Sequence, residues 1–159
     1  MRKDALFVVD TNVLLHDSYA LRTLAASEVY LPASVLEELD HFKRDVSDLG
    51  RNARHALLEL ETAFEKSSTK TSEDSQRLLV AKTLAGGHLT LVSSAQDDQK
   101  LLPSEFVGTK GDDNLLSIAK RLKAKNLTTP IVVLSKDRSL RIKALTLGVE
   151  ASEIGRAHV

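Results

Sequence analysis

The sequence predicts an α/β domain of three layers, α/β/α, with a mainly parallel sheet in the middle. Three short runs of branched apolar residues, 5–9, 88–92 and 131–134, indicate buried strands. Segments with helical periodicity separate these runs, and strands that alternate with helices form parallel sheets. The chain has 159 residues, of which 42% are hydrophobic, so it is long enough for one domain with its own core.

The elements follow one another in a regular order. A weaker strand, 29–31, lies between the first two runs and is stopped by Pro32. Apolar residues recur at helical spacing in six segments: 20–26, 33–43, 49–64, 75–85, 112–123 and 139–147. Glycine favours the position after a helix, so Gly86 and Gly87 are expected to end the helix at 75–85, and Gly148 the last one.

The chain is expected to form a single domain. Residues 65–72 are polar and indicate an exposed connection, but helical patterns resume on both sides of it. We therefore expect one domain over residues 1–152. Residues 153–159 have no pattern and could be a frayed tail, a truncation edge or a remnant of cloning.

Composition restricts the partners. The 22 Lys and Arg residues balance the 22 Asp and Glu residues, so any nucleic acid must be held by a local basic patch. The sequence has no cysteine, which excludes disulfides, thiolate catalysis and zinc sites built from cysteine. Because the apolar runs are short and the N-terminus lacks a signal-peptide pattern, we expect a soluble, cytoplasmic protein with no membrane contact.

Two aspartates follow predicted strands. Asp10 comes directly after the first strand, and Asp137 comes shortly after the strand at 131–134. Ligands of open α/β sheets bind beyond the carboxyl ends of the strands, although either residue could simply be a helix N-cap. Two carboxylates about 4 Å apart repel each other by about 4 kcal/mol at an effective dielectric constant of about 20. A bound cation would relieve this repulsion.

Three further acids lie on predicted helices. Asp112 falls beside the apolar stripe of its helix, near the N-terminus, where a carboxylate is favoured, and Asp113 points almost the opposite way. Glu38 lies at the margin of the apolar face of the helix at 33–43. The alternatives are that the two aspartates form a cap pair and that the glutamate is merely solvated.

The order of these residues resembles the PIN domain, a family of metal-dependent ribonucleases. The family pattern has an Asp after the first strand, often followed by x-N, then a helix P-x-x-V-x-x-E-L. An Asp three residues before an apolar residue and seven before an Ala comes next, and [S/T]-x-D follows a later strand. The matching residues are, in order, Asp10, Asn12, Pro32, Val35, Glu38, Leu39, Asp112, Leu115, Ala119, Ser135 and Asp137.

Two stretches narrow this resemblance. VLEELDHFKRDVSDLGRNARHALLELE and VLSKDRSLRIKALTLGVEA are similar to the PIN module at the N-terminus of PhoH-like ATPases. The matching residues include Lys43, Gly50, Asn52, Ala53, Arg54, Arg141 and Lys143. The sequence contains no G-x-x-x-x-G-K-[S/T] phosphate loop, so ATP hydrolysis by this chain is not predicted. The chain is either a domain excised from a longer protein with a C-terminal ATPase domain, or a free-standing relative.

The resemblance implies an endoribonuclease that cleaves single-stranded RNA and leaves a five-prime phosphate and a three-prime hydroxyl. An oxygen-only site suits Mg²⁺ or Mn²⁺, which would lower the pKa of a bound water. The implied catalytic residues, all of which also hold metal, are Asp10, Glu38, Asp112 and Asp137. Asp113 is an auxiliary acid that also holds metal, and Asn12 and Ser135 fit a surrounding shell that orients the carboxylates.

Basic residues on the flanking segments are candidates to contact RNA. They are Lys43, Arg51, Arg54, Lys136, Arg138 and Arg141. Each could equally belong to an ordinary solvated surface with ion pairs. Because the net charge is zero and aromatic residues are few, we expect weak, salt-sensitive binding with little reading of bases.

Other functions remain open. A toxin of the VapC type would copurify with a small antitoxin. A non-catalytic PIN-like module would bind RNA or a protein without turnover. A HAD phosphatase is disfavoured because Asn12 stands where that class has a second Asp, and a receiver domain is disfavoured because no Asp follows the middle strand. The apolar positions at 57–64 could serve a homo-oligomer, but core packing explains them equally well.

Overall fold

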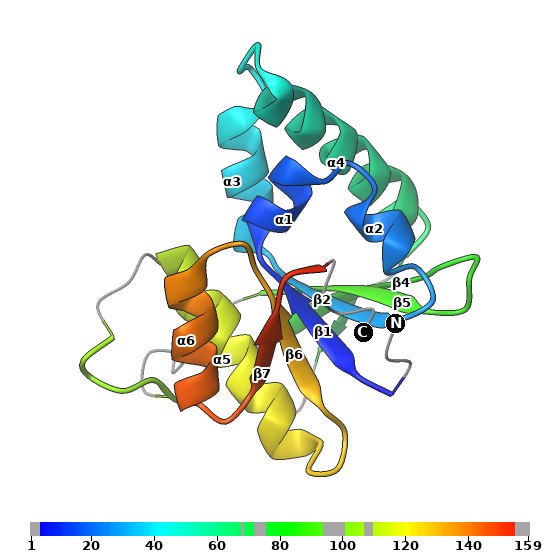
Figure 1. Ribbon diagram of the computed structural model, residues 1–159. Helices are drawn as coiled ribbons and strands as arrows, with labels where there is room; N and C mark the ends of the chain where they lie inside the picture. Colours follow the sequence, from blue (N-terminus) through cyan, green and yellow to red (C-terminus); the bar gives the residue numbers. More distant parts are fainter. Residues whose placement is uncertain (1–3, 68, 72–75, 94–100, 107–109, 155–159) are drawn as a thin grey trace.

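The computed structural model describes residues 4–67, 69–71, 76–93, 101–106 and 110–154 (Figure 1). Within these ranges the strands form one sheet of seven, in the order β3-β4-β5-β2-β1-β6-β7. Their bounds are β1 Leu6–Val9, β2 Glu28–Pro32, β3 Thr69–Thr71, β4 Arg77–Lys82, β5 His88–Val92, β6 Ile131–Leu134 and β7 Glu150–Ser152. The five neighbouring strands β5, β2, β1, β6 and β7 run parallel to one another. Strand β4 pairs antiparallel with β5 on one side and with β3 on the other. The predicted α/β class and mainly parallel sheet are confirmed.

Helices cover both faces of this sheet, which confirms the three layers (Figure 1). The helices are α1 Thr11–His16, α2 Ala20–Thr23, α3 Ser34–Phe42, α4 Asp48–Phe64, α5 Lys110–Lys125 and α6 Arg138–Thr146. Successive side chains of a strand point to opposite faces. Phe7 and Val9 therefore pack with the helices α1 to α4, whereas Val8 packs with α5 and α6. The central strands are apolar throughout because both of their faces are buried.

The centre of the sheet positions the candidate site. Strand β1 lies between β2 and β6, with Phe7 opposite Val29 on one side and Val132 on the other. Helix α1 leaves β1 toward one face, and α6 leaves β6 toward the other. The carboxyl ends of β1 and β6 therefore flank a point where the connections diverge, which is where α/β sheets place their ligands.

The predicted helix at 75–85 is wrong. Residues 77–82 form the strand β4, which pairs with β5 so that Leu78 lies opposite Val92 and Lys82 opposite His88. The segment RLLVAK contains residues that fit either structure, and hydrogen bonding to a neighbouring strand decides between them. Gly86 and Gly87 do not cap a helix as expected; they belong to the turn that joins β4 to β5. Gly86 has φ +93°, which a residue with a Cβ rarely adopts.

The other differences lie at short elements. The expected exposed connection at 65–72 contains the strand β3 at 69–71, with residues 68 and 72 outside the described ranges. The sequence also did not indicate α1 or β7, and α2 ends at Thr23, before the expected Ala26. Gly148 does follow the last helix, with φ +81°, as expected. None of the described helices has the length and apolar character needed to cross a membrane.

The motif G-x-N-A-R fixes the turn between α3 and α4. A Cβ on Gly50 would lie 1.7 Å from the main-chain oxygen of Asp45, so the two backbones approach too closely for any side chain. Asn52 donates to the carbonyl of Leu15 at 2.7 Å and ties α4 to the end of α1.

Near the C-terminal end of the described residues, Ile154 packs against the core. The domain boundary after residue 152 stays a prediction.

Candidate functional site

Asp10 follows β1 and occupies the N-cap position of α1, but its side chain makes no cap hydrogen bond. Instead, Ser135 Oγ donates to Asp10 Oδ2 at 2.7 Å, across the junction of β1 and β6. Both side chains are buried, with exposed fractions of 9% for Asp10 and 0% for Ser135. The capping alternative therefore does not explain Asp10.

The surroundings of Asp10 oppose its ionisation. Burial raises the pKa of this carboxyl from 3.8 to about 6, and the hydrogen bond from Ser135 works in the opposite direction. The negative charges of Asp112 and Glu38 contribute to this rise, and the value of about 6 already includes their effect. Asp10 is thus a buried acid beside other acids, which is an unfavourable arrangement unless a positive charge joins it.

Glu38 and Asp112 reach this region from two helices. Glu38, on α3, is half-buried, and burial raises the pKa of its carboxyl. The side chain of Thr11 forms a hydrogen bond with Glu38 that lowers this pKa, whereas Asp112 on α5 raises it. Three of the predicted acids are therefore close enough to act on one another. Thr11 was not among the site residues predicted from the sequence. The available signal was its position between Asp10 and Asn12.

The loop after β6 is held against the start of α1. Asn12 Oδ1 accepts the N–H of Lys136 at 3.0 Å, and Ser135 Oγ accepts the N–H of Asp137 at 2.9 Å. Ser135 therefore contacts Asp10 and the main chain of Asp137 at the same time. The two residues predicted to surround the acids, Asn12 and Ser135, do make bonds that fix the geometry of the loop.

Asp137 and Asp113 have different surroundings. Asp137 is exposed and caps α6, with Oδ1 accepting the N–H groups of Ser139 at 2.9 Å and Leu140 at 3.3 Å. Asp113 is partly buried in the first turn of α5. Among the described side chains, no three His, Cys, Asp or Glu residues lie close enough together to hold one metal ion. The acids form an open cluster rather than a closed cage.

The predicted cations on α3 and α4 have local partners. Lys43 pairs with Asp40 at 2.5 Å and Arg51 with Asp48 at 2.5 Å, both exposed. Arg54 donates to the carbonyl of Lys43 at 2.6 Å and so satisfies the C-terminal end of α3. Their contact with RNA stays a prediction, and for Arg54 the structure supplies a separate reason for its presence.

The cations on the β6–α6 side divide into two kinds. Arg141 donates to the carbonyl of Ser135 at 2.7 Å and lies 3.3 Å from a carboxylate oxygen of Glu153. Its side chain is 15% exposed. Lys136 and Arg138 are exposed, and neither forms an ion pair with any residue in the described ranges. These two remain available to a charged ligand.

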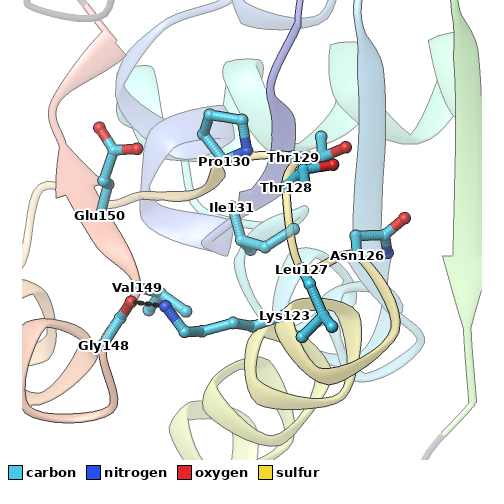
Figure 2. A pocket seen from close by; sticks show the side chains of 10 residues that line it. All are labelled: Lys123, Asn126, Leu127, Thr128, Thr129, Pro130, Ile131, Gly148, Val149 and Glu150. Carbon is cyan, nitrogen blue, oxygen red and sulfur yellow. Dashed lines mark hydrogen bonds between the residues drawn. The ribbon is translucent and has the colours of Figure 1, made fainter.

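Two hollows of the described structure lie away from the acids. A cavity of about 180 Å³ opens at the amino end of β6, around Ile131, between the C-terminal ends of α5 and α6 (Figure 2). Lys123 donates to the carbonyl of Gly148 there, and Glu150 is the carboxylate of its lining. A shallow apolar groove of about 540 Å³ runs between α2, α4 and the β4–β5 hairpin. Neither hollow is lined by Asp10, Glu38 or Asp112.

Comparison with known proteins agrees with the fold. The sequence model of the PIN domain matches residues 7–154. The chain belongs to the PIN domain family. Similar proteins include Protein PhoH2 of Bacillus subtilis, 32% identical over 152 residues that cover 93% of this chain and 32% of the relative. Protein PhoH2 of Mycolicibacterium smegmatis is 33% identical over 147 residues, covering 92% and 31%. This PIN domain spans about a third of the length of the curated relatives it matches.

A solved structure supports the fold. A domain of a functionally unknown protein from Methanocaldococcus jannaschii matches with a TM-score of 0.53 and 15% identity, covering 94% of this PIN domain and 91% of that chain.

PIN domains are in general nucleases, so the chain is a nuclease-like domain. The predicted resemblance to PIN domains related to PhoH-like proteins is confirmed.

Proposed function

We propose that this PIN domain is a divalent-metal-dependent endoribonuclease that cleaves phosphodiester bonds in single-stranded RNA, as part of a PhoH-like protein with a C-terminal ATPase domain. The observation that carries the proposal is Asp10, a buried acid without a capping bond, whose pKa is raised toward neutrality beside Glu38 and Asp112. Such a group destabilises the fold on its own, and a structural role does not account for it.

The donor set fits a hard cation. Carboxylate oxygens dominate the cluster, and the sequence contains no cysteine, so Mg²⁺ or Mn²⁺ suits it better than a soft metal. Because no three described acids lie close enough together to bind one ion directly, Asp10, Glu38 and Asp112 would hold the ion at least in part through water. A bound ion would supply an activated water and neutralise charge that develops on the phosphate.

The exposed and auxiliary acids complete the proposed set. Both capping bonds of Asp137 end on Oδ1, so capping does not use Oδ2, which could bind metal. Asp113 would act as an auxiliary acid. The chain's own hydrogen bonds set the geometry, because Ser135 orients Asp10, and Thr11 orients Glu38.

Lys136 and Arg138 are the proposed contacts for the RNA backbone. Replacing both with alanine is expected to weaken binding of single-stranded RNA and to reduce the slope of log affinity against log salt by roughly 1.4, since each phosphate contact contributes about 0.7. Binding measured by fluorescence anisotropy over a series of salt concentrations tests this. Lys123→Ala is the control, because Lys123 lies at the amino end of β6, away from the acids, where it donates to the carbonyl of Gly148. Equal slopes for the double variant and the wild type would remove Lys136 and Arg138 from the interface.

Arg141 is proposed to support the site rather than to bind RNA. Arg141→Ala leaves the carbonyl of Ser135 without its donor, so the free energy of unfolding should fall by about 1–3 kcal/mol while the salt slope stays unchanged. Arg138→Ala replaces an exposed arginine one turn earlier. It should lower the salt slope and leave the free energy of unfolding unchanged. Urea unfolding and RNA titration of both variants provide the comparison. A changed salt slope in Arg141→Ala would return Arg141 to the substrate contacts.

Cleavage itself is the direct test. A labelled single-stranded RNA is incubated with the protein and Mn²⁺, Mg²⁺ or EDTA, with Asp112→Asn in parallel. We expect cleavage with either ion, none in EDTA and none by the variant, whose circular dichroism should match the wild type. The open arrangement of the acids also favours a second candidate, a non-catalytic module that binds RNA. A folded protein that binds RNA and cleaves it under no condition would decide for that module.

A further inference from the structure

Gly111 is the second residue of α5 and directly precedes Asp112. Glycine weakens helices because it has the largest backbone freedom to lose on folding. Its φ angle lies outside the left-handed range, so the backbone at this position accepts any L-residue. The local conformation therefore gives no reason for glycine here.

The surroundings of Gly111 do give a reason. A Cβ built on this residue would lie 2.5 Å from Oε1 of Glu38 and 3.4 Å from its Cδ. Gly50 and Gly87 instead face main-chain oxygens, at 1.7 and 2.3 Å. At those two positions a side chain would collide with backbone that cannot easily move, whereas at Gly111 it would displace the end of a flexible side chain.

From this contact we infer that Gly111 is a positioning residue that keeps the space in which the carboxylate of Glu38 lies beside Asp112. Thr11 holds the same carboxylate by a hydrogen bond from α1. The hydroxyl of Thr11 on α1 thus holds the carboxylate, and the carboxylate occupies the space that a side chain at position 111 on α5 would fill. Its role in holding a divalent ion rests on the proposed function.

This arrangement predicts an unusual variant. Gly111→Ala should fold normally, with an unfolding temperature equal to or above that of the wild type, because alanine favours helix. It should nevertheless bind Mn²⁺ roughly tenfold more weakly or worse, as happens when groups that orient metal ligands are changed. Ala124→Gly, in the exposed last turn of the same helix, is the control and should alter stability but not Mn²⁺ affinity.

A double-mutant cycle separates positioning from a general effect. Mn²⁺ affinity is measured by calorimetry for the wild type, Gly111→Ala, Glu38→Ala and the double variant. We expect Gly111→Ala to weaken binding in the wild-type background and to have no further effect once Glu38 is alanine. The same loss in both backgrounds, or no loss in the wild type, would overturn the inference.

A metal-free readout keeps this inference separable from the proposed function. If the wild type binds no Mn²⁺, the proposed metal site fails, and the position of the Glu38 carboxylate is then compared in crystal structures of metal-free wild type and Gly111→Ala. We expect the carboxylate to move and its bond with Thr11 to be lost. An unmoved carboxylate would overturn the role of Gly111.

Discussion

Asp10→Asn is expected to reduce metal-dependent cleavage strongly while raising the unfolding temperature of the metal-free protein. Cleavage should fall on the order of a thousandfold, because the neutral amide is a poor metal ligand and a metal ion contributes several kcal/mol to catalysis. Stability should rise because the substitution removes a buried negative charge beside Glu38 and Asp112 while keeping nearly the same shape.

The size of the stability gain follows from the pKa of Asp10. A pKa raised from 3.8 to about 6 corresponds to about 3 kcal/mol of destabilisation once the group is ionised. This figure is an upper estimate for Asp10→Asn, since the amide must still be accommodated opposite Ser135. For a domain of this size, about 3 kcal/mol raises the unfolding temperature by roughly 6–12 °C.

Two measurements test Asp10→Asn together. Thermal unfolding at pH 7.5 in EDTA gives the stability, and RNA cleavage in Mn²⁺ gives the activity. Asp45→Asn is the matched control, because Asp45 is exposed and the pKa of its carboxyl is lowered by a hydrogen bond from Ser47. That control should keep its activity and gain no stability. A destabilised Asp10→Asn protein would mean that the charge of Asp10 serves the fold.

The metal-free protein should be more stable at pH 5 than at pH 7.5. Below pH 3.8 Asp10 is protonated in both the folded and the unfolded chain, so it contributes nothing. As the pH rises toward 6, the unfolded chain releases this proton while the folded chain retains it, which favours unfolding. The full penalty, about 3 kcal/mol, is present above pH 6. Glu38, whose pKa is also raised, acts in the same direction.

Unfolding free energies measured in urea from pH 4 to 8 test this dependence. The pKa values of Asp40 and Asp45 are lowered, so their contribution is lost below about pH 4, outside the decisive range. In EDTA we expect stability to fall between pH 4 and 6, and Asp10→Asn should remove most of that fall. Added Mn²⁺ should stabilise the protein more at pH 7.5 than at pH 5, because binding requires the ionised carboxylates. If the free energy of unfolding in EDTA did not change with pH, ionised Asp10 would not destabilise the fold.

Both predictions express one property of the domain. The cluster keeps Asp10 in a place where an uncharged residue would be more favourable to folding, and the bonds from Ser135 and Asn12 hold the surrounding loop in position. Local departures from what stability favours are expected at functional sites and not in the rest of a fold. The acids are therefore stronger indicators of function than their exposure alone would suggest.

The sequence by itself determined the fold class, the central strands and the identity of the clustered acids. Runs such as 5–9 and 131–134 are apolar throughout because both faces of a central strand are buried, and this pattern is present in the chain before it folds. Asp10 could be identified because a residue directly after such a strand must lie at the carboxyl edge of the sheet.

The tertiary structure alone decided the remaining features. Residues 77–82 became a strand through pairing with β5, and the side chain of Arg141 donates to the carbonyl of Ser135. Asp137 caps a helix, whereas Asp10, which also follows a strand, does not. These outcomes depend on contacts between residues far apart in the chain and on the loss of water around Asp10. Local periodicity reports neither, because it records only which residues are neighbours along the backbone.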